Sequence, residues 1–393
     1  MKLLIAIPAL NEEASIAATI ERCLEAAPRI VAETDVAAVD VTVVSDGSTD
    51  HTVERAKPYL GRIELIVFEK NRGYGAAIKE AWHRSDAELL AFLDADGTCD
   101  PNFFVPLCNA VTADGVSVAL GCRRNPESKM PFLRRIGNAL FSTLLTTLSS
   151  RRTRDTASGM RVVRRDALDR LYPLPDGLHF TPAMSARVLL SDDLRLVELD
   201  MPYHERAGES KLRAGKDGLR FLRVILKTAV LFRPFRLLGL AAIPLLAAAL
   251  VLLVRPVANW IHNGVWPAGA RGAEASAGGV LLTAAALLFC AGYLAARIVE
   301  VVLQVGNDGT TYRLLRAFFG ARWFWSVPIG VATAGIGAGL AGALSTGGGR
   351  GLFTMMVLGA TAVLAGVTRL LDRFIEVVDD RLVYERERAR LDA

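Results

Sequence analysis

The chain has 393 residues and a mass of 42.3 kDa, which allows two or three domains. Its 52% of hydrophobic residues and mean hydropathy of +0.31 are too apolar for an ordinary soluble protein, while its 22% of charged residues are too many for a protein that lies wholly in a membrane. These figures exclude intrinsic disorder, collagen and a disulfide scaffold, and they predict a soluble domain joined to a hydrophobic one.

From residue 1 to about 210, short apolar runs alternate with longer amphipathic segments. The β-rich runs of strand length are Leu3–Ile7, Val41–Val44, Ile63–Phe68, Leu89–Leu93 and Val116–Leu120. Segments of helical length and pattern lie between them, at Glu12–Ala27, Thr49–Tyr59, Gly75–Arg84 and Asn102–Thr112. Because strands that alternate with helices form parallel sheets, we predict an α/β domain with a mostly parallel sheet covered on both faces.

A polar cluster follows each predicted strand. These clusters are Pro8–Glu13, Ser45–Asp50, Asn71–Gly75, Asp94–Asp100 and Gly121–Arg124. Ligands of parallel α/β sheets bind beyond the carboxyl ends of the strands. We therefore expect the functional site at this edge of the sheet.

The chain changes character after residue 236. Uncharged runs of 18 to 27 residues follow at Leu237–Val254, Gly278–Ala296, Trp323–Gly349 and Gly351–Thr368. Each run can cross a hydrocarbon core of about 30 Å. We predict an α-helical membrane domain over 237–371 with four transmembrane helices, at about 237–254, 278–300, 324–345 and 352–370. Buried helices of a soluble protein are the alternative.

A basic belt, Arg213–Arg236, separates the two regions and carries seven basic residues against one acid. Such a belt is typical of a juxtamembrane segment that faces anionic headgroups, whereas a nucleic-acid binder would spread its charge over the folded domain. We predict amphipathic helices over 213–236 and no nucleic-acid partner, with a solvated helix face as the alternative. The Lys and Arg bias predicts a cell-membrane protein whose folded domain, both termini and charged tail (372–393) are cytoplasmic.

Two carboxylates follow the predicted strand Leu89–Leu93. Alternation along an extended chain points Asp94 and Asp96 the same way. Two hard oxygen ligands on one face can hold a divalent cation, Mg²⁺ or Mn²⁺, while phosphate oxygens complete its coordination. A short acidic turn without a ligand is the alternative.

Two other strand ends carry groups that suit a nucleoside. A buried carboxylate at Asp46 can accept a hydrogen bond from a nucleobase imide or a ribose hydroxyl. Ser48 or Asp50 could instead cap the following helix. In the first cluster, Glu12 is a candidate nucleoside contact, and Asn11 is either a contact or a helix N-cap.

Paired arginines form a further group of candidates. Arg123 and Arg124 end a predicted strand, and Arg134 and Arg135 open an apolar helix that begins near Pro131. Guanidinium groups suit phosphate because they donate two parallel hydrogen bonds. The arginine pairs therefore agree with an acceptor that carries phosphate, and a solvated position outside the site is the alternative for Arg134.

The segment Glu205–Lys211 lies just before the basic belt, where a membrane-bound phosphate and a nucleotide would meet. We expect Arg206, Ser210 and Lys211 to contact the diphosphate or the acceptor. A structural turn is the alternative.

The motifs PALNEE, VSDGSTD, NRGYGAA, LDADGT, SGMRVVRRDAL and ERAGESKL occur in this order. Together they resemble the family 2 glycosyltransferases of the GT-A fold, and most of all the dolichol- and polyprenyl-phosphate sugar synthases. The resemblance covers about residues 1–212 and implies a Rossmann-like GT-A catalytic domain. It also implies inverting transfer of a hexose from a nucleotide sugar (GDP-mannose or a UDP-sugar) to a polyprenyl or dolichyl monophosphate at the cytoplasmic membrane face.

The resemblance also assigns residues. The nucleotide sugar would contact Pro8, Asn11, Glu12, Asp46, Arg72, Gly73 and Asp94. Asp94 and Asp96 would serve the metal and diphosphate, and Arg123 and Arg135 the acceptor phosphate; these four form the implied catalytic set. Many relatives place Gln two positions after the second Asp. Here Thr98 takes that place as a weaker metal ligand, so the cation would bind more loosely or through water.

The nature of the acceptor bears on the need for a catalytic base. A phosphate monoester with a second pKa of about 6 is mostly dianionic at neutral pH, so it is already a nucleophile. Transfer to a lipid hydroxyl or another glycan would need a base, and a nucleotide-sugar-binding protein without turnover is a second alternative. The sequence has no Q-x-x-R-W motif, which argues against polymer synthesis.

Overall fold

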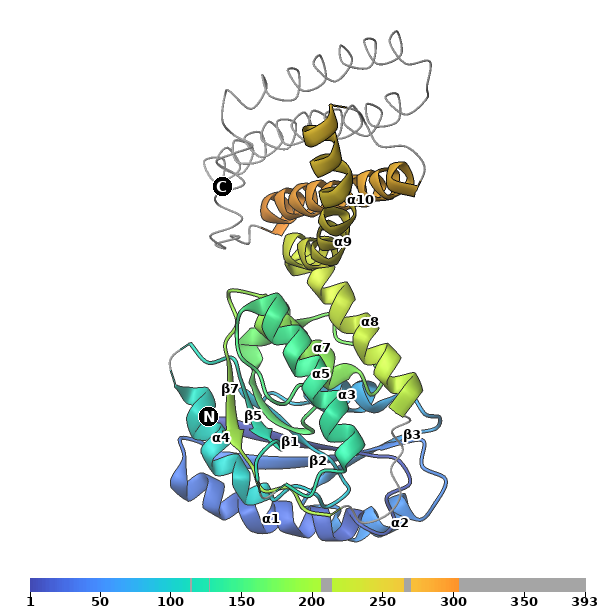
Figure 1. Ribbon diagram of the computed structural model, residues 1–393. Helices are drawn as coiled ribbons and strands as arrows, with labels where there is room; N and C mark the ends of the chain where they lie inside the picture. Colours follow the sequence, from blue (N-terminus) through green and yellow to red (C-terminus); the bar gives the residue numbers. More distant parts are fainter. Residues whose placement is uncertain (114, 127, 206–213, 265–269, 304–393) are drawn as a thin grey trace, which may run out of the picture. The chain divides into compact units, whose positions relative to one another are not determined.

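The computed structural model of the protein describes residues 1–113, 115–126, 128–205, 214–264 and 270–303 (Figure 1). Contacts divide the chain into two compact units, Met1–Ala229 and Val230–Ala393. Helix α8 (Ala214–Phe232), which contains most of the predicted basic belt, lies almost wholly within the first unit.

The first unit is built on a seven-stranded sheet of order β3-β2-β1-β4-β6-β5-β7. Its strands are β1 (Lys2–Ala9), β2 (Ala38–Asp46), β3 (Glu64–Phe68), β4 (Leu89–Leu93), β5 (Val118–Cys122), β6 (Met160–Arg164) and β7 (Leu196–Asp200). Neighbouring strands are parallel except at β6, which is antiparallel to β4 and β5. The predicted mostly parallel sheet is confirmed.

Helices cover both faces of this sheet. They are α1 (Ile16–Glu33), α2 (Thr52–Ala56), α3 (Tyr74–Arg84), α4 (Phe104–Thr112), α5 (Phe132–Ser149), α6 (Leu168–Leu171) and α7 (Phe180–Leu190), with short 3₁₀ turns at Lys57–Tyr59, Pro101–Phe103 and Arg165–Ala167. Alternate residues of β1 point to opposite faces: Leu3 and Ile5 pack in one core with α1 and α4, and Leu4 and Ala6 pack in the other with α3 and α7. Central strands are therefore apolar on both sides, as buried parallel strands are.

Several elements differ from the sequence prediction, and helices α6 and α7 were not among the predicted helices. Helix α1 does not end before Pro28 but continues to Glu33, because Ala26 and Ile30 on either side of the proline are buried in the same core. Strands β6 and β7 were not among the predicted strands. Each contains charged residues, such as Arg161 in β6 and Glu198 in β7, that interrupt an apolar run.

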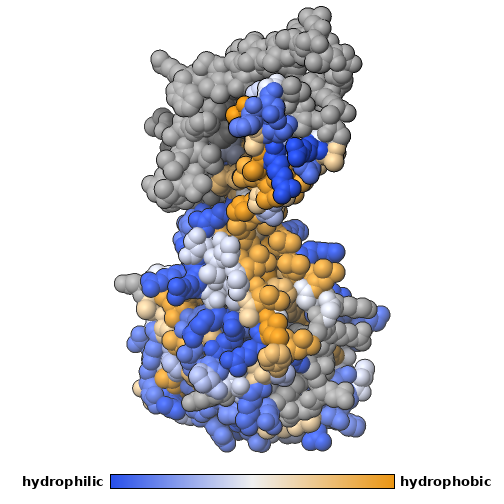
Figure 2. All heavy atoms as spheres, viewed as in Figure 1, coloured by the Kyte–Doolittle hydropathy of each residue, from blue (hydrophilic) through white to orange (hydrophobic). Residues whose placement is uncertain are grey.

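The second unit contains two helices that are long and apolar enough to cross a membrane, α9 (Pro234–Asn263) and α10 (Ala270–Leu303). The two helices pack against each other. At Gly278 of α10 the contact is so close that a Cβ would lie 2.7 Å from Cγ of Leu253 in α9. Apolar side chains of α9 such as Val251 and Val254 are exposed, and Figure 2 shows the apolar surface of this helix. The predicted spans at 324–345 and 352–370 and the tail lie outside the described residues, so four transmembrane helices remain a prediction.

Candidate functional site

A cavity of about 400 Å³ lies at the carboxyl edge of the sheet. All five polar clusters that follow the predicted strands contribute to its lining. The lining residues that the sequence singled out are Pro8, Glu12, Asp46, Gly73, Asp94, Asp96, Arg123 and Arg134. The strand order thus brings the ends of β1, β2, β4 and β5 to one place.

Asp94 follows the end of β4 and is held from two sides. The Tyr74 hydroxyl donates a hydrogen bond of 2.6 Å to Oδ1 of Asp94. Burial, and next the Asp94 carboxylate, raise the pKa of Tyr74 well above its usual range, so this hydroxyl keeps its proton. On the other side, the backbone of Gly159 comes so close that a Cβ built there would overlap Oδ2 of Asp94. The carboxylate therefore occupies space that is open only because residue 159 is glycine.

Asp96 is buried and its orientation is fixed by Thr98. Oγ1 of Thr98 donates a hydrogen bond of 2.6 Å to Oδ1 of Asp96, and the Thr98 backbone N–H donates to the same oxygen at 3.2 Å. Thr98 is fully buried and does not line the cavity. The structure thus places the predicted metal ligand Thr98 behind Asp96, where it orients the carboxylate.

The donor set of the cavity suits a hard divalent cation. Asp94 and Asp96 both present carboxylate oxygens, which Mg²⁺ and Mn²⁺ prefer. Within the described part of the chain, no group of three or more His, Cys, Asp and Glu side chains could hold a metal ion. A cation held here would therefore need phosphate oxygens or water to complete its coordination.

Asp46 fixes the loop that follows β3. Its carboxylate accepts hydrogen bonds from the backbone N–H groups of Arg72 at 2.6 Å and Gly73 at 2.9 Å. Burial raises the pKa of Asp46, and these hydrogen bonds oppose the rise. Gly73 has a φ of +110° and lies against the backbone of Asp176, so this position requires glycine. Asp46 therefore shapes the cavity wall as well as lining it.

Arg72 and Asn11 do not line the cavity. The guanidinium of Arg72 lies over the Phe68 ring, 4.3 Å from its centroid. The side chain of Asn11 accepts a hydrogen bond of 2.8 Å from the Thr49 backbone N–H, and it is not a helix N-cap because α1 begins at Ile16. The contacts to a nucleotide sugar predicted for Arg72 and Asn11 gain no support from this geometry.

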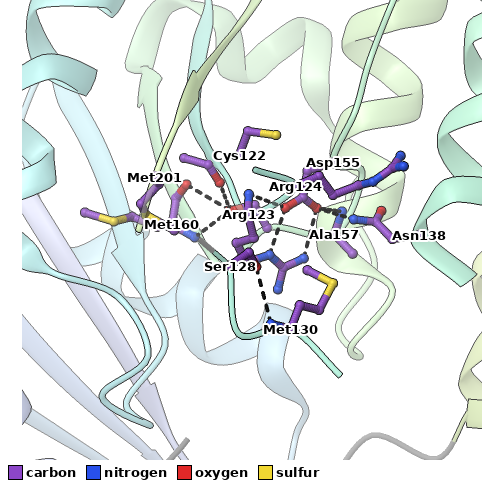
Figure 3. A network of polar contacts seen from close by, with 12 residues as sticks. Cys122, Arg123, Arg124, Ser128, Met130, Asn138, Asp155, Ala157, Met160 and Met201 are labelled. Carbon is purple, nitrogen blue, oxygen red and sulfur yellow. Dashed lines mark hydrogen bonds and ion pairs between the residues drawn. The ribbon is translucent and has the colours of Figure 1, made fainter. Parts of the chain in front are cut away.

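Arg123 lines the cavity with a guanidinium that is paired with Asp155 (Figure 3). Its Nε and Nη2 donate to the two carboxylate oxygens at 2.8 and 2.9 Å, and its backbone N–H donates at 3.0 Å. Burial alone would raise the pKa of Asp155, but the Arg123 charge and hydrogen bonds hold that pKa at about 2. The Tyr203 ring centroid lies 5.5 Å from the guanidinium carbon. The pair is therefore ionised at neutral pH and fixes the plane of the guanidinium.

Helix α5 brings Arg134 rather than Arg135 to the cavity. Arg134 lines the cavity, whereas Arg135 is exposed and does not. Successive residues of an α-helix are rotated by about 100°, so neighbours face different directions. The structure therefore brings Arg134, and not the predicted Arg135, to the lining of the cavity.

Helix α8 adds Arg220 and Phe221 to the lining of the cavity. Nη1 of Arg220 lies 3.1 Å from Oδ1 of Asp217, and the Phe221 ring lies 5.9 Å from the Phe141 ring of α5. A residue of the predicted basic belt thus reaches the site itself. The other predicted contacts near this belt, Arg206, Ser210 and Lys211, lie outside the described residues.

Three residues at the site, Tyr74, Asp155 and Tyr203, were not singled out from the sequence, and Arg220 was predicted to face the membrane and not the site. Tyr74 had a signal, because it lies within the motif NRGYGAA beside Gly73. Asp155 had none, because its place beside Arg123 depends on the unpredicted strand β6, which follows its loop.

Comparisons with known proteins agree with this architecture. The sequence profile of glycosyl transferase family 2 matches residues 4–172. The low-salt glycan biosynthesis hexosyltransferase Agl6 of Haloferax volcanii is 31% identical over 286 residues, which cover 72% of this chain and 65% of that protein. A dolichyl-phosphate hexose transferase of the same organism is 31% identical over 192 residues, which cover 48% of this chain and 80% of that protein.

Among solved structures, glucosyl-3-phosphoglycerate synthase from Mycobacterium tuberculosis is 21% identical, with a TM-score of 0.45 over 58% of this chain and 78% of that one. Of the two Haloferax relatives, the chain spans just under two thirds of the Agl6 protein and four fifths of the dolichyl-phosphate hexose transferase. The sheet order, the acidic pair at the end of β4 and the sequence matches to the family profile and to the two Haloferax proteins lead to one assignment. The chain belongs to glycosyl transferase family 2, and its first unit is a catalytic domain of the GT-A fold.

Proposed function

We propose that the protein transfers a hexose, with inversion, from a nucleotide sugar to a polyprenyl or dolichyl monophosphate. The observation that carries this proposal is one cavity that brings the carboxylates of Asp94 and Asp96 together with the guanidinium groups of Arg123 and Arg134. Carboxylates suit a cation that binds diphosphate, and arginines suit the acceptor phosphate. The names of the two Haloferax relatives, a hexosyltransferase and a dolichyl-phosphate hexose transferase, support the same substrate classes.

The donor would lie along the ends of β1, β2 and β4. Pro8, Glu12, Asp46 and Gly73 line this part of the cavity and would hold the nucleoside. Asp94 and Asp96 would hold a divalent cation, Mg²⁺ or Mn²⁺, which when bound neutralises the diphosphate and stabilises the departing nucleoside diphosphate. UDP-sugars and GDP-mannose are both candidate donors.

The acceptor phosphate would bind on the side of Arg123 and Arg134. A dianionic phosphate oxygen attacks the anomeric carbon, a new carbon–oxygen bond forms, and the bond to the nucleoside diphosphate breaks. No proton has to be removed from the nucleophile, so the protein's task is alignment and charge neutralisation. The arginines would hold the acceptor in line with the donor and limit repulsion between the two phosphate groups.

A lipid acceptor requires that the cavity lie near a bilayer. Helix α5 exposes Phe132, Leu133 and Leu140, whose relative exposures are 78%, 67% and 66%, and these side chains suit the surface of a membrane. The apolar helices α9 and α10 follow in the chain. We propose an integral membrane protein of the cell membrane with the catalytic unit and both termini in the cytoplasm, on the basis of the Lys and Arg bias.

A transfer assay tests the proposed function. Membranes that contain the protein are incubated with labelled UDP- or GDP-sugars and a polyprenyl phosphate, with and without Mg²⁺ or Mn²⁺. We expect a cation-dependent lipid product that mild acid hydrolyses, and we expect Asp96→Asn to abolish it while leaving the protein folded. An acid-stable glycolipid would indicate transfer to a hydroxyl, and the absence of product with every donor would indicate a binding protein; both results would contradict the proposal.

A further inference from the structure

We propose that Asp155 is a positioning residue for the acceptor side of the site. It holds Arg123 directly and, through Asn138, the segment of α5 that carries Arg134. The inference rests on the proposed function, because it assigns the acceptor phosphate to these two arginines. Asp155 itself does not line the cavity, so it acts through other residues.

The contact with Arg123 fixes that guanidinium at several points. Asp155 is fully buried, and its two oxygens accept from Nε and Nη2 of Arg123 and from the Arg123 backbone N–H. The bidentate pair sets the plane of the guanidinium and uses two of its donors. Among the described residues, the side-chain hydrogen bonds of Arg123 come from Nε and Nη2, and the residue lines the cavity.

The same carboxylate also binds α5. Nδ2 of Asn138 donates a hydrogen bond of 2.8 Å to Oδ1 of Asp155, as Figure 3 shows. Oδ1 of Asn138 in turn accepts from the backbone N–H of Thr156 at 3.0 Å. Asn138 lies four residues after Arg134, and residues at this spacing share one face of a helix. Asp155 therefore ties the face of α5 that bears Arg134 to the loop that holds Arg123.

The loop that carries Asp155 is itself fixed to the sheet. Arg161 of β6 is fully buried, and its Nε and Nη2 donate to the carbonyl oxygens of Ser158 and Thr156, each at 3.0 Å. The Ser158 hydroxyl donates to the carbonyl oxygen of Gly121, at the end of β5, at 2.6 Å. The loop then ends at Gly159, against Asp94. One rigid loop thus carries both the carboxylate that positions the acceptor arginines and the glycine that confines Asp94.

The test compares acceptor and donor kinetics in four forms of the full-length protein in vesicles: wild type, Asp155→Asn, Arg123→Ala and the double variant. We expect Asp155→Asn to raise the KM for polyprenyl phosphate about tenfold, the loss expected when a charged hydrogen bond is misaligned. The KM for the nucleotide sugar should change by less than about twofold. Asp200→Asn is the matched control, because Asp200 pairs with Arg154, the neighbour of Asp155, but is exposed.

The double variant separates positioning from general support of the fold. If Asp155 acts through Arg123, the Asp155→Asn change should raise the acceptor KM by a smaller factor in the Arg123→Ala background than in the wild type. The effect that remains is the part that acts on Arg134 through Asn138. Equal increases in the donor and acceptor KM, or full additivity of the two changes, would overturn the inference. Wild-type protein that forms no polyprenyl-phosphate sugar would instead overturn the proposed function.

A second variant keeps the inference testable if Asp155→Asn does not fold, as judged by loss of nucleotide binding. Asn138→Ala removes the link to α5 and leaves the Arg123–Asp155 pair in place. We expect a rise in acceptor KM with unchanged nucleotide affinity. An unchanged acceptor KM in the folded Asn138→Ala protein would overturn the proposed coupling to Arg134.

Discussion

Asp94 shows how single residues set the geometry of this site. Its carboxylate accepts a hydrogen bond of 2.6 Å from the Tyr74 hydroxyl and also contacts the backbone of Gly159. The carboxylate leaves no room for a Cβ on residue 159. The Tyr74 ring is itself fixed, because it packs edge-on against Phe92 and Phe180. Residues from a helix, a strand and a loop thus determine the place of one carboxylate.

We expect Gly159→Ala to displace the Asp94 carboxylate and to lower kcat/KM for transfer by about 100-fold, since a misplacement of about 1 Å can cost that much. Gly137→Ala is the matched control, because a Cβ at this position of α5 would meet no atom within 4 Å. Steady-state rates, with a thermal unfolding curve for each variant, separate a change of geometry from a loss of fold. Wild-type activity in folded Gly159→Ala would show that Asp94 does not need this position.

The Arg123–Asp155 pair makes stability depend on pH at the acid end. The folded protein holds the pKa of Asp155 at about 2, below the usual 3.8. Because the folded-state pKa is the lower one, the stabilisation is fully present above about pH 4 and is lost as the pH falls through about 2. We expect the Tm difference between wild type and Asp155→Asn to be largest above about pH 5 and to shrink towards pH 2. A difference that does not vary with pH would show that ionisation of Asp155 does not stabilise the fold.

Strand-end residues of the site could be predicted from the sequence, and loop partners could not. Asp46, Asp94 and Asp96 each follow an apolar run, and the order of parallel strands brings such ends together. Asp155 contacts Arg123 across 32 positions of sequence, on a loop set by an antiparallel strand that no periodicity marks. The sequence shows that Asp155 is a carboxylate, but it does not show that this carboxylate pairs with Arg123.

At the scale of elements, α5 decides which arginine reaches the cavity. The helix exposes apolar residues such as Phe132 and Leu140 and buries polar ones such as Asn138 and Ser142. The first half of α5 thus departs from the usual amphipathic pattern, in which the apolar face packs on the core, whereas the second half buries Leu145 and Leu148. A sequence argument based on periodicity therefore could not choose between Arg134 and Arg135.

The two arginines of α5 provide a matched pair of variants. We expect Arg134→Ala to weaken use of the lipid acceptor by about 1.5 kcal/mol, or about tenfold in KM, because it removes a charged hydrogen-bond donor from the cavity. Arg135→Ala should change the acceptor KM by less than about twofold, because Arg135 is exposed outside the lining. Measurement of both acceptor KM values decides the assignment, and the reverse order of effects would restore Arg135 as the phosphate contact.

At the scale of the whole molecule, the sequence located the two candidate membrane helices that the structure describes, but not the residues at which they end. Helix α9 was expected to stop at Val254, before Arg255 and Pro256, but it continues to Asn263. A charged side chain near a helix end can extend towards water while the backbone stays helical, so the charge does not mark the last residue. The later predicted spans lie outside the described residues.

The basic belt contains one residue that lines the cavity and other basic residues that lie only on the protein surface. Arg220 lines the cavity, whereas Arg223 and Lys227 are exposed one turn apart on α8. We expect joint neutralisation of Arg223 and Lys227 to impair use of a long-chain acceptor in anionic vesicles by tenfold or more, since each charge near such a surface contributes about 1 kcal/mol. Use of a short, water-soluble acceptor and nucleotide binding should not change. Full activity on the long-chain acceptor would show that these charges serve topology alone.

The central claim is that the sugar is transferred to a lipid phosphate. It is tested most directly by identifying the oxygen that joins the sugar to the acceptor. Purified full-length protein is placed in vesicles with diacylglycerol and a polyprenyl phosphate whose phosphate oxygens carry oxygen-18, and the nucleotide sugar and divalent cation are added. If an acceptor phosphate oxygen attacks the anomeric carbon, the oxygen that bridges sugar and phosphorus carries the label and the anomeric configuration is inverted. An unlabelled bridging oxygen, or a sugar joined to the glycerol hydroxyl, would contradict transfer to a lipid phosphate.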